Sequence, residues 1–292
     1  MSARAERVTP RLLKRWGQPQ PGESKYDRGV VLVVGGARRS PGAVALAGVA
    51  ALRVGAGRLT LGAAGSVADG LAIAVPECGI VPLGETGKGS VRGDAADELE
   101  SDLGSSNAVL FGPGLDDVEA AAQLLDGVVE RVGEDTIVVL DAFALVAVHD
   151  EPARIDELGG RVILTPNPTE LAMLADEDEI RGSDTRAVLR AARSVAARLR
   201  AVVATQNLVV DPSGSAWAIH AGNPGLGTSG SGDVLAGAIA GMAARGVGAT
   251  RAAVWGTYVH AAAGDRLAAT APVGYLAREL SDSFPSILAA LR

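Results

Sequence analysis

An alternation of short apolar runs with segments of helical periodicity is the feature that most constrains how this chain can fold. Strands are expected at 30–36, 58–64, 107–114, 136–142 and 161–167, and helices at 41–57, 116–131 and 184–200. Parallel strands are buried on both faces and joined by helical crossovers, so this order predicts a mostly parallel sheet with helices on both sides. Ser40 is expected to cap the 41–57 helix, with Pro41 in its first turn.

The final third of the chain has a different character. Residues 202–220 predict short strands, more antiparallel than the others, around the D-P-S-G turn at 211–214. Helices are expected to follow at about 232–245 and 249–268. No linker rich in Pro, Ser or Gly separates the 292 residues into parts, so the sequence is interpreted as one domain.

Charge and composition exclude several classes of partner. The formal net charge is -7 and no run of Lys or Arg occurs, so neither nucleic acid nor a membrane is an expected partner. An anionic ligand would have to be held by local donors. No apolar run is long enough to span a bilayer, and the N-terminal segment does not resemble a secretory signal. The single cysteine, Cys78, suits a reducing compartment. A cytoplasmic location is therefore expected.

A glycine-rich loop, G-N-P-G-L-G-T-S-G-S-G-D-V-L-A-G at 222–237, points most directly to chemistry. It is not a Rossmann fingerprint, because no Asp or Glu lies between Asp233 and Asp265 to bind a ribose hydroxyl. It is not a Walker A loop either, because no lysine follows Gly230. What remains is a glycine-rich turn at the start of a helix, which suits a phosphate group.

Asp233 is the unusual residue in such a cradle, since a carboxylate repels phosphate. A phosphoryl-transfer site needs a carboxylate to accept the proton of the attacking hydroxyl. A helix cap is the alternative role for an aspartate at this position. The residues alone leave both roles open.

The loop resembles the signature of the ADP-dependent NAD(P)H-hydrate dehydratases, a family of the ribokinase-like superfamily. The similarity continues in family order through V-V-L-V-V-G-G-A-R-R-S-P-G-A, V-L-F-G-P-G-L, V-V-L-D-A-F-A-L, L-T-P-N-P-T-E-L and H-A-A-A-G-D-R-L-A. The resemblance implies an α/β fold, the ribokinase-like three-layer α/β/α sandwich, as a single domain over 25–292 after an amino-terminal extension over 1–24. It also implies a separate epimerase and a homo-oligomer, with a tetramer as one form.

The resemblance further implies repair of hydrated NADH and NADPH. ADP would phosphorylate the ring hydroxyl with Mg²⁺ assisting, and loss of phosphate would restore the dihydronicotinamide. Asp233 would be the general base and a substrate contact, and the backbone N–H of Gly232 would contact the nucleotide phosphates. Further substrate contacts implied by the family motifs are Ala43, Gly114 and Asn167. The adenine nucleotide would lie along Val203, Ala204, Thr205, Gln206 and Asn207. No metal ligand can be named.

The sequence departs from the family pattern at three places. Asn167 stands where a histidine is usual, and an asparagine can hydrogen-bond but cannot carry charge at neutral pH. Val203 stands where the nucleotide segment usually has lysine, and Phe143 where a second acid is common, which leaves Asp141 alone. Two other functions therefore stay open: a ribokinase-like kinase of a small vitamin-precursor alcohol, and a non-catalytic nucleotide-binding protein.

The remaining polar candidates have two interpretations each. Glu170 would organise Mg²⁺ through water or serve as a first-turn helix carboxylate. Arg38 and Arg39 would meet substrate phosphates or remain solvated loop charges. The three histidines have no ligand-like spacing, and surface or core roles are expected for His149, His220 and His260.

Overall fold

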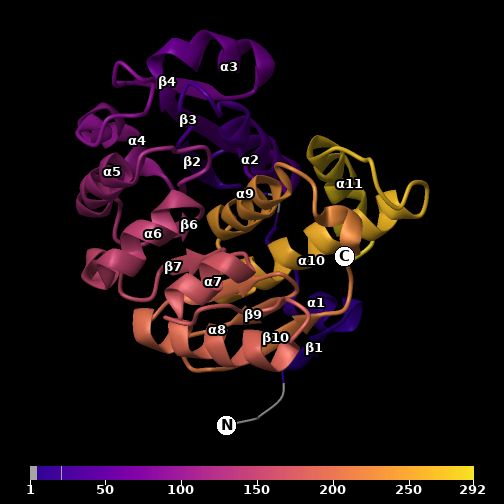
Figure 1. Cartoon of the computed structure of the whole chain (residues 1–292). Helices are drawn as coiled ribbons and strands as arrows, with labels where there is room; N and C mark the ends of the chain where they lie inside the picture. The colour runs from indigo at the N-terminus through magenta and orange to yellow at the C-terminus, as the bar shows by residue number, and fades with distance from the viewer. Residues whose placement is uncertain (1–4, 21) are drawn as a thin grey trace.

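The strands of this chain form one continuous sheet with helices packed on both of its faces (Figure 1). The computed structural model describes residues 5–20 and 22–292. The sheet order is β1-β10-β9-β8-β7-β6-β5-β2-β3-β4. The strands are β1 (Glu6–Val8), β2 (Val30–Val34), β3 (Arg58–Ala64), β4 (Gly79–Leu83), β5 (Ala108–Phe111), β6 (Ile137–Leu140), β7 (Val162–Leu164), β8 (Val202–Thr205), β9 (Leu208–Val210) and β10 (Ala216–Ile219).

The helices divide between the two faces. They are α1 (Pro10–Trp16), α2 (Gly42–Arg53), α3 (Ala68–Ala74), α4 (Glu100–Ser105), α5 (Val118–Arg131), α6 (Phe143–Asp150), α7 (Pro168–Leu174), α8 (Thr185–Leu199), α9 (Ser231–Ala244), α10 (Ala249–Ala268) and α11 (Ala277–Ala289). On one face α2, α9, α10 and α11 pack on the sheet, and on the other α5, α6, α7 and α8 do (Figure 1).

Successive residues of one strand enter different cores, because side chains alternate across a sheet. Val31 and Val33 of β2 pack in the first core, and Leu32 and Val34 pack in the second. All five residues of β2 are buried, as expected for a central parallel strand. The predicted α/β sandwich with a mostly parallel sheet is confirmed.

The antiparallel character expected after residue 202 is also confirmed. Strand β9 pairs antiparallel with both β8 and β10, and the D-P-S-G turn connects β9 to β10. The helices expected near 232–245 and 249–268 are α9 and α10. No helix in the described ranges 5–20 and 22–292 combines the length and apolarity needed to cross a bilayer.

The beginning of α2 differs from the prediction. Pro41 is the N-cap residue and no side chain caps the helix, so Ser40 does not serve as the N-cap. Instead the backbone of Ser40 forms a turn: its N–H donates to the Ala37 carbonyl at 2.9 Å, and its carbonyl accepts from Ala43 N at 3.3 Å. The turn leaves Ser40 one residue too early to cap.

The segment before residue 25 adds an unpredicted strand to the sheet. Strand β1 pairs in parallel with β10, and Trp16 of α1 meets Trp217 edge to face at 6.4 Å between ring centroids. Residues 1–4 of the expected extension lie outside the described residues. The boundary at residue 24 stays a prediction.

Helices α2 and α9 approach each other more closely than side chains would allow. A Cβ added to Gly237 would lie 2.0 Å from the carbonyl oxygen of Ala47, and one added to Gly241 would lie 2.6 Å from that of Ala51. Two glycines of α9 therefore let its backbone rest directly on the backbone of α2.

We expect Gly237→Ala to destabilise the protein by about 1–3 kcal/mol, because overpacking forces the two helices apart. Gly70→Ala is the matched control, since a Cβ on Gly70 of α3 would meet nothing within 4 Å. The control should retain or gain stability through helix propensity. Urea unfolding measures both. Equal midpoints for Gly237→Ala and the wild type would contradict the proposed close contact.

Candidate active site

Ala43 and Gly114, far apart in sequence, lie side by side at the carboxyl ends of the central strands. The carbonyl of Gly114 accepts from Ala37 N at 2.9 Å. A Cβ on Gly114 would lie 2.4 Å from the Ser40 carbonyl and 3.0 Å from the Ala43 Cβ. Gly114 has φ of 72°, so both its conformation and its close neighbours favour glycine. The loops that follow β2 and β5 therefore bring these two small residues together.

Asp233 lies in the first turn of α9 and does not cap it. The N-cap is Gly230, with φ of 86° and no side-chain hydrogen bond. Among the residues that the structure describes, no hydrogen bond or ion pair reaches the Asp233 carboxylate. Burial raises the pKa of Asp233 to about 6, so the group is mostly ionised at neutral pH. An unpartnered, partly desolvated carboxylate is available to accept a proton.

A second buried carboxyl group, Asp141, follows β6. Its Oδ1 accepts a hydrogen bond from the Thr165 hydroxyl at 2.8 Å. Burial raises the pKa of Asp141 to about 7, the Thr165 hydrogen bond opposes the rise, and the charges of Asp233 and Glu170 add to it. The next residue, Ala142, has φ of 52°, a strained conformation of the kind that collects at functional sites. Three acidic groups from β6, α7 and α9 therefore meet at this edge.

A cavity of about 530 Å³ opens beside the start of α9. Its walls come from the segment 165–168, the turn after β8, the glycine-rich loop and the first turn of α9. Four of the predicted nucleotide-binding residues line it: Ala204, Gln206, Asn207 and Gly232. Its walls are more apolar than polar, as is usual for a small-molecule site.

Two predicted nucleotide-binding residues, Val203 and Thr205, are buried within β8. Thr205 lines a neighbouring cavity of about 480 Å³, and its hydroxyl has no hydrogen-bond partner among the described residues. Gln206, at the turn between β8 and β9, lines both cavities and has φ of 49°.

Asn167 lines the 530 Å³ cavity and also caps α7. Its Oδ1 accepts from the backbone N–H groups of Thr169 and Glu170, both at 2.9 Å. In return the Glu170 carboxylate accepts from Asn167 N at 2.8 Å, which completes a capping box. The oxygen of Asn167 thus caps the helix, and its Nδ2 has no hydrogen-bond partner among the described residues.

His260 of α10 also lines the cavity, and sequence reasoning gave it no functional role. Its Nε2 lies 3.0 Å from the Ser231 hydroxyl, at the start of α9. Burial lowers the pKa of His260 to about 4, so its ring is neutral and anchors the glycine-rich turn without adding charge. The two partners are 29 positions apart in the chain, and this spacing follows no motif that could have revealed the contact. The other two histidines do not line this cavity. His220 is exposed, and the Nδ1 of His149 lies 3.9 Å from the Oδ1 of Asp176.

Within residues 5–20 and 22–292, no three side chains of His, Cys, Asp or Glu gather as a possible metal-binding group. Glu170 is engaged in the capping box, in agreement with the helix-carboxylate interpretation. Asp141 and Asp233 remain as hard oxygen donors near the cavity.

Comparison with known proteins agrees with this geometry. Residues 31–286 match the family model for NAD(P)H-hydrate dehydratase. The chain is 43% identical to the ADP-dependent (S)-NAD(P)H-hydrate dehydratase of Xanthomonas campestris pv. campestris, over 98% of this chain and 96% of that protein. It is 34% identical to the bifunctional NAD(P)H-hydrate repair enzyme Nnr of Moorella thermoacetica, over 89% of this chain but only 49% of that enzyme.

Solved structures share the fold over the whole chain. The ADP/ATP-dependent NAD(P)H-hydrate dehydratase of Bacillus subtilis, co-crystallised with ATP/Mg²⁺, has a TM-score of 0.78 at 26% identity and 100% coverage of both chains. A ribokinase-like superfamily protein of Enterococcus faecalis has a TM-score of 0.81 at 22% identity, covering 100% of this chain and 97% of that one. The second likeness concerns the fold alone.

The raised pKa of Asp141 predicts a specific pH dependence of stability. The ordinary pKa of an aspartate is 3.8, whereas that of Asp141 in the folded chain is about 7. Between these two pH values Asp141 loses its proton in the unfolded chain but keeps it in the folded chain. The stability of the wild type should therefore fall as pH rises through this window, relative to Asp141→Asn, by a few kcal/mol in all. Urea unfolding of both proteins from pH 4 to pH 8 tests this. A difference that does not change with pH would contradict it.

Asn167 offers a separate test of the capping box. Asn167→Ala should lower the free energy of unfolding by about 1 kcal/mol, because two backbone N–H groups lose their acceptor. Asn167→Ser retains a capping oxygen and should keep most of the stability. If thermal denaturation shows that both variants lose stability equally, the cap is not the source of the effect.

Proposed function

The chain is a member of the NAD(P)H-hydrate dehydratase family, and from this membership we propose that it restores NADH and NADPH from their hydrated forms at the expense of ADP. The observation that supports this most directly is the unpartnered Asp233 carboxylate. The residue before it, Gly232, lines the 530 Å³ cavity. This arrangement brings a proton acceptor next to a phosphate-binding turn.

The proposed reaction begins with phosphoryl transfer. The Asp233 carboxylate accepts the proton of the ring hydroxyl as the hydroxyl oxygen bonds to the transferred phosphorus, and the bond from phosphorus to the AMP oxygen breaks. A pKa near 6 keeps Asp233 ionised at neutral pH yet basic enough for this task. Loss of phosphate with a ring proton then forms the double bond of the dihydronicotinamide.

The surrounding residues would bind and orient the two ligands. Gly232 N–H and the positive end of α9 would hold nucleotide phosphates, with the turn fixed by the bond between Ser231 and His260. The adenine nucleotide would run along the 203–207 segment, where Ala204, Gln206 and Asn207 line the cavity. The other two residues of the segment, Val203 and Thr205, are buried within β8.

The substrate would meet Ala43, Gly114 and Asn167. The first two are small and adjacent, so they allow close approach of the dinucleotide. Asn167 would donate from Nδ2, since its oxygen is engaged in the cap.

Mg²⁺ would enter with the nucleotide phosphates, because Mg²⁺ usually combines phosphate oxygens and water with one or two carboxylates. Asp141 and Asp233 fit that donor set in charge and hardness, and the described residues provide no complete cage. When bound, the ion neutralises phosphoryl charge. A cytoplasmic location and a homo-oligomeric state remain part of this proposal.

We expect Asp233→Asn to lower kcat by orders of magnitude while leaving nucleotide binding largely in place, because the amide cannot accept the hydroxyl proton. Asp69→Asn is the matched control, since Asp69 also lies in a first helical turn but on exposed α3. The assay follows the return of reduced-nicotinamide absorbance from NADH hydrate with Mg²⁺. Full turnover by Asp233→Asn would refute the general-base role.

The same assay with ADP or ATP identifies the phosphoryl donor. Recovery of absorbance in the wild type would establish the dehydration and name the donor. Accumulation of a stable phosphorylated product would instead favour the kinase function. Nucleotide binding without either product would favour a non-catalytic protein.

A further inference from the structure

A short hairpin, residues 85–91, packs against the loop that follows β2. Glu85 and Val91 form an antiparallel bridge, and Gly89 N donates to the Thr86 carbonyl at 2.9 Å to close a tight turn. Lys88 is therefore at the third position of this turn. The hairpin is joined to the loop 36–40 because Arg38 N donates to the Gly89 carbonyl at 2.9 Å.

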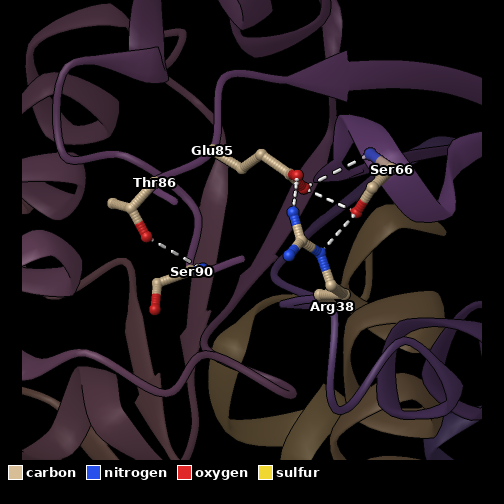
Figure 2. A network of polar contacts seen from close by, with 5 residues as sticks. All are labelled: Arg38, Ser66, Glu85, Thr86 and Ser90. Carbon is tan, nitrogen blue, oxygen red and sulfur yellow. Dashed lines mark hydrogen bonds and ion pairs between the residues drawn. The ribbon is translucent and has the colours of Figure 1, made fainter. Parts of the chain in front are cut away.

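The Arg38 side chain connects three loops (Figure 2). Its guanidinium forms an ion pair with Glu85 and donates from Nε to the Ser66 hydroxyl at 3.2 Å. The Ser66 hydroxyl in turn donates to the Glu85 carboxylate at 2.7 Å. Arg38 follows β2, Ser66 lies in a short turn after β3, and Glu85 follows β4, so one network fixes the ends of three neighbouring strands.

Gly89 allows this arrangement. It has φ of 89°, and a Cβ at this position would lie 2.6 Å from the Arg38 Cβ and 2.8 Å from its Nε. The guanidinium stem thus lies directly over the glycine, and a larger residue would displace it.

The network leaves two cations free at the same junction. Glu85 is neutralised by Arg38, so the hairpin carboxylate does not cancel the charge of Lys88. Arg39 and Lys88 are both exposed, and neither forms an ion pair or hydrogen bond through its side chain with the described residues. Each is one residue from the hydrogen bond between Arg38 N and the Gly89 carbonyl, so their backbones lie close together.

The loop that carries Arg39 also forms the wall of the proposed substrate site. Ala37 N donates to Gly114 O, and the Ser40 carbonyl lies against Gly114. Arg39 lies between these two residues in the chain. A chain with net charge -7 needs local cations to hold a dinucleotide that carries several phosphate charges.

We propose that Arg39 and Lys88 bind phosphate groups of the hydrated dinucleotide, and that Arg38 is a positioning residue that holds the 85–91 hairpin in place through Glu85 and Ser66. This inference rests on the proposed function. The phosphate could be the pyrophosphate that both substrates share or the 2′-phosphate found only in NADPH hydrate, and a comparison of substrates distinguishes the two.

The first experiment compares KM and kcat of Arg39→Gln/Lys88→Gln with those of the wild type. The double variant should raise KM about tenfold and leave kcat within about twofold, since the cations bind phosphate away from the reacting hydroxyl. If KM rises with NADPH hydrate alone, the two cations bind the 2′-phosphate. If KM rises equally with NADH hydrate, they bind the pyrophosphate. Arg7→Gln/Arg11→Gln, on β1 and α1 at the opposite edge of the sheet, also removes two positive charges and is the charge-matched control, which should change neither constant.

The second experiment tests Arg38. Arg38→Gln should raise KM without a matching fall in kcat, although Arg39 and Lys88 are still present. The exchanged pair Arg38→Glu/Glu85→Arg should recover part of the loss, because it restores the ion pair. A purely structural role would lower the melting temperature of Arg38→Gln and leave KM unchanged, and that result would overturn the positioning role.

Failure of the proposed function is distinguishable from failure of this inference. Turnover by the double variant with an unchanged KM would overturn the inference alone. Absence of turnover in the wild type would overturn the dehydratase function, and calorimetric titration with NADPH and NADH would then decide the inference. Equal Kd values in wild type and double variant, or no binding by the wild type, would overturn it.

Discussion

The close approach of α9 to α2 is the contact on which the site depends. Gly237 and Gly241 allow the backbone of α9 to lie on that of α2 at Ala47 and Ala51. Both helices begin at the same edge of the sheet, one with Ala43 and the other with Asp233. Because helices are rigid over these lengths, contact along their middles sets the separation of their first turns. The distance between Ala43 and the Asp233 carboxylate is therefore set by the packing of α9 on α2.

Three acidic groups lie near one another at this edge of the sheet, and no ion pair with a described residue neutralises them. Burial raises the pKa of Asp141, Asp233 and Glu170, and the charges of the last two raise that of Asp141 further. His260, which contacts Ser231 at the start of α9, is neutral. Such an arrangement is unfavourable for folding, and carboxylates with raised pKa values are a feature of acid–base sites. The cations lie further out, where Arg38 is paired and Arg39 and Lys88 face solvent. The acidic groups and these cations thus come from different segments of the chain.

Sequence reasoning failed where a contact joins distant segments or involves very few residues. Strand β1 has three residues and forms only because β10 offers an edge, so its own pattern was too short to be recognised. The bond between Ser231 and His260 spans two helices and follows no motif. Ser40 had the right residue type for an N-cap, but the local turn at Ala37 shifted the helix start. The roles assigned to the site residues stay predictions.

The mostly parallel sheet and the glycine-rich turn before α9 could be predicted from the order of residues, because apolar periodicity and positive φ are local properties that individual residues impose. The interactions of the polar residues could not be predicted in this way, because they depend on the folded arrangement. Asp233 lies three residues after the N-cap Gly230 and does not cap α9. Asn167 caps α7 because its oxygen accepts from two backbone N–H groups of the first turn. Arg38 is neutralised because the loops after β2, β3 and β4 meet. The partner and pKa of an ionisable group are set by neighbours from distant parts of the chain, and the order of residues alone does not specify them.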